Sequence, residues 1–161
     1  PIKAYSNLFF APKNLSSFIK NPGLIINEKD QDFSISKKIS VKIGSEEKKI
    51  YIPIISIENK TFLDATMLDG SIATASKIKS GNPYCLFLIV CETYEVKKEI
   101  DPQYTDIDQI YSLRKSTTRG SRDPIQADII LDLFNKVKNH LDSDWSNVAE
   151  NIKSGKIIKW G

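Results

Sequence analysis

The sequence predicts an α/β domain in which a mixed β-sheet is flanked by helices. Two apolar runs, residues 50–60 and residues 84–90, are typical of strands buried inside a sheet. Between them, residues 63–79 carry apolar side chains at helical spacing. A strand, a helix and a strand in this order predict two parallel strands joined by a right-handed crossover. The apolar stripe of this helix consists of Leu63, Met67, Leu68, Ile72, Ala75 and Ile78.

The segment before the first apolar run predicts its antiparallel partner. Residues 32–43 alternate loosely between polar and apolar side chains, which indicates a strand. A Gly-Ser pair follows, and we interpret the charged residues 46–49 as part of a solvated hairpin turn that leads into residues 50–60. Further upstream, residues 1–22 are interpreted as a lead-in that ends in a turn, and residues 24–26 are too short to assign.

The last third of the chain predicts one more strand and a long helix. Residues 107–113 fit a strand, although a helix fits them nearly as well. Asp123 and Pro124 predict a helix start, as the N-cap and the first helical residue. Residues 145–160 predict a short helix, a turn and an edge strand. The side chains expected to face inward from the long helix are Ile129, Ile130, Leu133, Phe134, Val137 and Leu141.

Length and composition limit the class of protein. With 161 residues and 40% hydrophobic content, the chain can bury one core, so we expect a single domain over residues 1–161. It starts at Pro1 without a signal-peptide pattern, and it is either a whole domain or the excised part of a longer chain. No apolar run approaches the roughly 20 residues that span a bilayer, so no membrane partner is expected.

The histidine and cysteine content limits the kinds of active site that the chain can form. His140 is the single histidine, which argues against a histidine metal cluster and a Ser-His-Asp triad. Cys85 and Cys91 lie six residues apart in one expected strand, about 20 Å from each other, so they cannot pair. We interpret both as reduced structural thiols of a cytoplasmic protein. Catalysis, if present, must therefore come from carboxylates, lysine or hydroxyl groups.

The basic residues are unevenly distributed. The net charge is only +3, but 20 of the 23 basic residues are Lys, and the three Arg fall within nine positions, at Arg114, Arg119 and Arg122. Arginine presents a planar fork that suits phosphates and guanine edges, whereas lysine is a solvated point charge. This cluster indicates contact with nucleic acid; the alternative is a flexible, solvated loop.

A carboxylate and an ammonium close the run at residues 50–60. Side chains alternate between the faces of a strand, so Glu58 and Lys60 project side by side. Glu-x-Lys occurs four times in the chain, and only this copy follows a strand that begins with an acid, Asp32, with Asp30 as the alternative. Two carboxylates on neighbouring strands can share one cation. The competing interpretation is a surface ion pair worth at most about 1 kcal/mol.

This arrangement resembles the PD-(D/E)xK nuclease superfamily, although no proline precedes Asp32. Over roughly residues 24–142, the chain is similar to type II restriction endonucleases related to BbvCI. The stretches that carry this second resemblance are residues 54–64, 82–84 and 107–115. The fold that both resemblances imply is the restriction-endonuclease-like mixed sheet.

The resemblance implies a sequence-specific endonuclease that hydrolyses double-stranded DNA with Mg²⁺ and leaves 5′-phosphates. Asp32, or alternatively Asp30, would bind the cation together with Glu58 and the main-chain carbonyl of Asn59. Lys60 would orient or deprotonate the attacking water. The DNA contacts implied for the basic loop are Arg114, Lys115, Arg119 and Arg122.

Cutting both strands usually requires two active sites, so the resemblance also suggests a homodimer or a heterodimer of related subunits. Two alternatives stay open at this point. One is a non-catalytic DNA-binding or interaction module that keeps the same fold. The other is a structure-selective DNA repair nuclease.

Overall fold

The computed structural model describes residues 2–20, 23–43, 46–97, 101–143, 145, 152–153 and 155. Six strands and three α-helices longer than one turn are assigned in this part of the chain, together with a short 3-10 helix, η1 (Pro102–Tyr104). In chain order the other elements are β1 (Ile2–Phe10), α1 (Leu15–Lys20), β2 (Leu24–Gln31), β3 (Phe33–Ile43), β4 (Glu46–Leu63), α2 (Ala65–Gly81), β5 (Leu86–Tyr94), β6 (Gln109–Ser116) and α3 (Ala127–Asp142).

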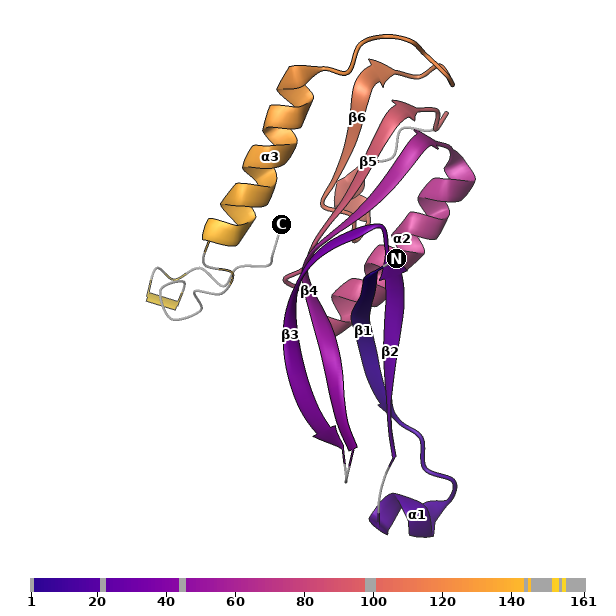
Figure 1. The fold of residues 1–161 in the computed structure, drawn as a ribbon, viewed down its shortest axis with the longest axis vertical. Helices are drawn as coiled ribbons and strands as arrows, with labels where there is room; N and C mark the ends of the chain where they lie inside the picture. Colours follow the sequence, from indigo (N-terminus) through magenta and orange to yellow (C-terminus); the bar gives the residue numbers. More distant parts are fainter. Residues whose placement is uncertain are drawn as a thin grey trace.

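The central sheet has the order β3-β4-β5-β6 (Figure 1). β3 and β4 are antiparallel, whereas β5 is parallel to both β4 and β6. The predicted hairpin and the predicted parallel crossover are therefore confirmed, and the strand predicted over residues 107–113 is observed as β6, which begins at Gln109. The expected α/β fold with a mixed sheet flanked by helices is also confirmed.

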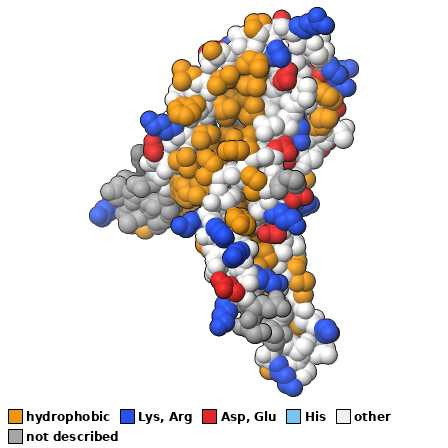
Figure 2. All heavy atoms as spheres, viewed as in Figure 1, with side chains coloured by type: hydrophobic (Ala, Val, Ile, Leu, Met, Phe, Trp, Pro, Cys, Tyr) orange, Lys and Arg blue, Asp and Glu red, His pale blue; other side chains and the backbone are white. Residues whose placement is uncertain are grey.

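Each face of the sheet packs against one helix. Apolar residues of α2, including Leu68 and Ile78, pack with Phe87 and Ile89 of β5 in one core cluster. On the opposite face, Leu88 and other residues pack with α3 through Ile129, Leu133 and Val137. Figure 2 shows hydrophobic side chains gathered where α3 meets the sheet. β5 is buried on both faces, as its continuous apolar run predicted.

Residues 2–20 and 23–31 form structure that the sequence did not reveal. β1 and β2 pair as an antiparallel hairpin, with α1 at its far end (Figure 1). β1 packs on α2 and lies beside β4. The interpretation of residues 1–22 as a lead-in was therefore wrong. The buried residues of β1 are Ala4 and Ser6, one small and one polar, so the strand lacks the apolar alternation by which strands are recognised.

The start of α3 was also predicted wrongly. The helix begins at Ala127, and its N-cap, Gln126, makes no side-chain capping bond. The backbone N–H of Gln126 donates to the carbonyl of Leu113 at 2.8 Å, which ties the preceding segment to β6 instead of letting it coil. The Asp123 carboxylate accepts a bond from Ser121 Oγ at 2.6 Å within that loop.

Two further sequence predictions need correction. Ile130, Phe134 and Leu141 were expected to face inward, but they are 48%, 61% and 43% exposed. The stripe of α3 that packs on the sheet is narrower, because only one side of this helix meets it. Residues 46–49 belong to β4 and not to a turn. The elements predicted over residues 145–160 lie almost entirely outside the described residues.

Both cysteines are free and buried, which fits their interpretation as structural thiols. Burial raises the pKa of the Cys85 thiol to about 12 and that of Cys91 to about 11, so both are protonated at neutral pH. Cys85 lies just before β5 and Cys91 lies within it. Within the described chain, no helix is long and apolar enough to cross a membrane.

Gly81 is needed where the end of α2 meets β1. A Cβ at this position would lie 2.1 Å from the Ser6 carbonyl oxygen and 2.9 Å from the Tyr5 ring. We expect Gly81→Ala to lower the free energy of unfolding by about 1–3 kcal/mol, because backbone must move to admit the methyl group. Gly70→Ala is the matched control for this substitution. A Cβ built at Gly70, in the same helix, would have no atom within 4 Å. This variant should therefore raise the free energy of unfolding by up to about 1 kcal/mol. Urea denaturation measures both; equal stability of Gly81→Ala and wild type would refute the close approach.

Candidate active site at the end of β4

The antiparallel register brings Asp32 next to Glu58. Phe33, the first residue of β3, pairs with Ile57 of β4, so Asp32 lies opposite the segment that follows Ile57. The Asp32 carboxylate accepts a bond from the Asn59 backbone N–H, with 2.8 Å between Oδ2 and N. Two strands thus place one carboxylate each at the same position of the sheet edge.

Glu58 and Lys60 project together, as the strand alternation predicted. The Lys60 ammonium lies 3.3 Å from Glu58 Oε2. That same oxygen accepts a bond from the Ser71 hydroxyl of α2 at 2.6 Å, so the pair lies on the sheet face that α2 covers. The Glu58 side chain is 12% exposed and that of Lys60 is 29% exposed. The ammonium is therefore reachable from solvent, while the carboxylate is largely enclosed.

Asp30 and Asp32 are separated by a buried residue. Gln31 is 1% exposed and accepts a 2.6 Å bond from the hydroxyl of Ser56, which is fully buried. Asp30 belongs to β2 and pairs with Lys3 of β1. In the described part of the chain, the Asp30 carboxylate has no bond to β4. The geometry therefore brings Asp32 to Glu58 and does not bring Asp30 there.

The donor atoms at this edge suit a hard divalent cation. Asp32 and Glu58 supply carboxylate oxygens, and the Asn59 carbonyl lies in the backbone between Glu58 and Lys60. Mg²⁺ is commonly held through one or two carboxylates and keeps several waters. Among the described residues, no group of three or more His, Cys, Asp or Glu side chains could hold a metal ion. Any cation here would therefore depend on two carboxylates and the carbonyl.

Three of the four basic residues expected to contact DNA are paired with carboxylates of the protein, and Arg114 and Lys115 are the first two. The Arg114 guanidinium lies 2.9 Å from a Glu92 carboxylate oxygen and also donates to the Asp123 carbonyl. Lys115 pairs with Asp128 of α3 at 2.5 Å, and this bond lowers the pKa of the Asp128 carboxyl. Lys115 also has a positive φ of 49°, which is unusual for a residue other than glycine. These contacts fix the start of the basic loop.

Arg119 is bound close to the end of β4 that carries Glu58 and Lys60. Its guanidinium lies 2.9 Å from Glu95 and 3.8 Å from Asp64, and its central carbon is 3.6 Å from the centroid of the Phe62 ring. Phe62 follows Lys60 by two residues, so the loop lies beside the Glu58 and Lys60 pair. Arg122 is exposed, and among the described residues it has no carboxylate partner.

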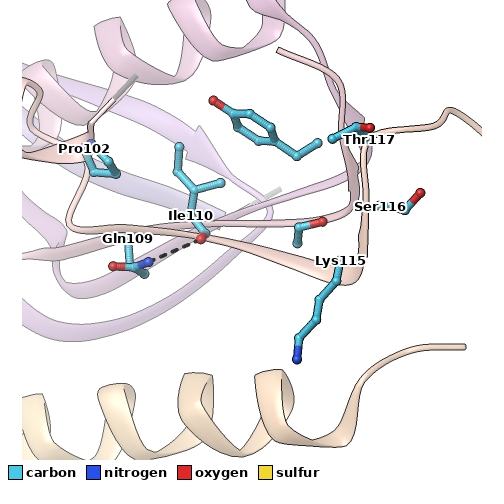
Figure 3. A pocket seen from close by; sticks show the side chains of 8 residues that line it. Pro102, Gln109, Ile110, Lys115, Ser116 and Thr117 are labelled. Atoms are coloured by element: carbon cyan, nitrogen blue, oxygen red, sulfur yellow. Dashed lines mark hydrogen bonds between the residues drawn. The ribbon is translucent and has the colours of Figure 1, made fainter. Parts of the chain in front are cut away.

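A pocket of about 370 Å³ lies beside β6 (Figure 3), and its lining residues do not include Asp32, Glu58 or Lys60. Its walls include Tyr94, Pro102, Ile110 and Thr117. Figure 3 shows the Lys115 side chain turned away from Ile110 and toward α3. None of the described residues that line this pocket is acidic, so it offers no carboxylate to a cation.

Sequence reasoning missed Ser71, whose hydroxyl donates to Glu58, and Gln31, the buried residue directly before Asp32. Ser71 lies three residues after Leu68 and four before Ala75, which is an inward position of the α2 stripe. A polar residue at an inward position of a helix was the signal that could have identified Ser71 in the sequence. Gln31 gave a weaker signal, because the strand that carries it was not recognised.

Comparison with known proteins shows which fold and family this chain shares. A chain of the native BbvCI A2B2 tetramer has the same fold, with a TM-score of 0.74 and 22% sequence identity. The similarity covers 87% of this chain and 57% of the BbvCI chain, so this chain spans little more than half the length of that relative. Curated proteins gave no match. The model of the Bpu10I restriction endonuclease family matches residues 1–122, and the chain therefore belongs to this restriction endonuclease family.

Proposed function

We propose that this chain carries the catalytic site of a sequence-specific DNA endonuclease that depends on Mg²⁺. The observation that carries the proposal is the meeting of Asp32 with the Glu58 and Lys60 pair, through a 2.8 Å bond from Asn59 N to Asp32 and a 3.3 Å ion pair. Membership of a restriction endonuclease family supports double-stranded DNA as the substrate.

Asp32, Glu58 and the Asn59 carbonyl are the proposed ligands of the cation. When bound, Mg²⁺ polarises the phosphoryl oxygens and makes a nearby water more acidic. Topology favours Glu58 and Lys60 over the similar pair Glu95 and Lys97. β4 has an antiparallel neighbour, β3, which Asp32 directly precedes, whereas the neighbours of β5 are both parallel.

Lys60 is proposed to orient or deprotonate the attacking water. The water oxygen forms a bond to phosphorus and gives up a proton, and the bond from phosphorus to the 3′ oxygen breaks. The 3′ oxygen takes up a proton, so the products are a 5′-phosphate and a 3′-hydroxyl. The Lys60 ammonium also offsets negative charge that develops on the phosphoryl group. Its 29% exposure lets a phosphate approach, and its ion pair with Glu58 keeps it beside the proposed ligands.

The basic loop is proposed to contact the DNA. Arg122 is available for a phosphate without any rearrangement, because it is exposed and has no carboxylate partner among the described residues. Arg114, Lys115 and Arg119 would add contacts by exchanging carboxylate for phosphate oxygens, or to base edges. The contacts of Arg119 with Glu95 and the Phe62 ring hold its part of the loop near the end of β4 before DNA binds.

We infer that residues 1–161 act as a single nuclease domain within a larger assembly. The chain spans 57% of the length of the similar BbvCI chain, whose assembly is an A2B2 tetramer. One chain offers one set of Asp32, Glu58 and Lys60. Cutting both strands then requires a second set from a homodimer or from a related subunit.

Mixed-sequence plasmid DNA tests this function directly. The protein is incubated with Mg²⁺ and, in parallel, with EDTA. Discrete fragments with Mg²⁺ and intact plasmid with EDTA are the expected result. If the protein binds DNA without cleaving it, and salt weakens this binding steeply, the chain is a non-catalytic binding module and the proposal is wrong. Cleavage restricted to branched or single-stranded DNA would indicate a repair nuclease.

A further inference from the structure

We propose that Ser71 is a positioning residue for Glu58, whose carboxylate it orients toward the cation. The inference rests on the proposed function, since it takes Glu58 as a metal ligand. It adds a residue of α2 to a site otherwise built on β4 and the start of β3.

One carboxylate oxygen of Glu58 is bonded to other side chains of the protein, and the other oxygen is available to a ligand. Oε2 lies 2.6 Å from the Ser71 hydroxyl and 3.3 Å from the Lys60 ammonium. Among the described residues, no donor is bonded to Oε1. With Oε2 held from two sides, rotation of the carboxylate is restricted and Oε1 has a defined direction. A bond from a hydroxyl to a charged carboxylate is short and strong, as this one is.

Burial makes the Ser71 hydroxyl an effective anchor. Ser71 is 1% exposed, so water does not compete for its bond to Glu58. The helix that carries it is fixed at its start, where the Asp64 carboxylate accepts a bond from Met67 N at 2.8 Å. On either side of Ser71, Leu68 and Ala75 are fully buried in the core. Sites held by such rigid, packed elements keep their geometry best.

A second buried contact lies next to the other proposed ligand, Asp32, in the chain. Ser56 and Gln31 are 0% and 1% exposed, and their side chains are 2.6 Å apart. Gln31 directly precedes Asp32, and Ser56 lies two residues before Glu58 on the same side of β4. Each proposed carboxylate ligand is thus connected to a buried hydroxyl, one directly and one through the neighbouring residue. Outer groups of this kind typically change metal affinity 10- to 100-fold when removed.

The test measures Mn²⁺ binding to the whole chain without DNA, through the loss of the free-ion electron paramagnetic resonance signal. Mn²⁺ suits the same oxygen ligands as Mg²⁺. The variants are Ser71→Ala, Ser71→Thr and Glu58→Gln. Ser76→Ala is the matched control, because Ser76 is an exposed serine of the same helix. Thermal unfolding of every variant shows whether the fold is kept.

We expect Ser71→Ala to bind Mn²⁺ about 10-fold more weakly than wild type, with Ser76→Ala unchanged. Ser71→Thr keeps the hydroxyl and should recover most of the affinity. Wild-type affinity in Ser71→Ala would overturn the inference while leaving the proposed function intact, provided that Glu58→Gln loses binding. Wild-type affinity in Glu58→Gln would instead remove Glu58 from the metal site and overturn both.

Discussion

Replacing Lys60 by alanine should lower the rate of DNA cleavage by about 10²–10⁴-fold, the range that a positioned proton-transfer group contributes. The ammonium lies 3.3 Å from Glu58 and is partly exposed, so alanine removes the group that would hold the water and leaves the proposed ligands in place. Single-turnover cleavage at saturating enzyme isolates this step from DNA binding. Affinity for DNA, measured in Ca²⁺, should change far less than the cleavage rate.

The chain supplies a control for this substitution. Glu95 and Lys97 repeat the Glu-x-Lys spacing after β5, and Lys97 is exposed. Glu95 is already engaged by Arg119 at 2.9 Å. Lys97→Ala should cleave at the wild-type rate. If Lys97→Ala is inactive and Lys60→Ala is not, the catalytic lysine has been assigned to the wrong strand.

Asp32→Asn should lower cleavage by more than about 100-fold, which exceeds the usual effect of groups that only support a ligand. The asparagine side chain keeps an oxygen to accept the bond from Asn59 N–H, so the local fold should persist. What it loses is the negative charge that attracts the cation. The Mg²⁺ concentration for half-maximal rate should rise at the same time.

Asp30→Asn is the matched comparison for Asp32→Asn. Asp30 is exposed in β2, and in the described chain its carboxylate does not reach β4. The Asp30→Asn variant should cleave DNA at a rate within about threefold of wild type, because most surface substitutions have small effects. A severe loss in Asp30→Asn with an active Asp32→Asn would exchange the roles of the two acids.

The sequence predicted those parts of the fold in which side-chain periodicity is strong. Residues 50–60 and 84–90 were recognised as strands because both runs are apolar and bounded by polar residues. β1 was missed because its inward side chains, Ala4 and Ser6, carry little hydrophobic signal. The start of α3 was misplaced because Asp123 and Pro124 have a strong local propensity to begin a helix. In the structure, the backbone bond between Gln126 and Leu113 holds this segment against β6, and the helix begins later.

The candidate site was predictable only in part. The period of a strand placed Glu58 beside Lys60, and the hairpin placed Asp32 near them. Sequence could not show that Arg114 and Arg119 bind Glu92 and Glu95, because these pairs join residues 22 and 24 positions apart across separate elements. Nor could it single out Ser71, whose importance depends on the packing of α2 against β4.

Asp32, Glu58 and the Asn59 carbonyl are proposed to hold the catalytic cation together. Crystals grown with Mn²⁺ and measured at its absorption edge test this most directly, because anomalous scattering locates the ion independently of activity. We expect an anomalous peak within coordinating distance of both carboxylates and the carbonyl. A peak elsewhere, for example between Asp64 and Glu95, with none beside Glu58, would contradict it.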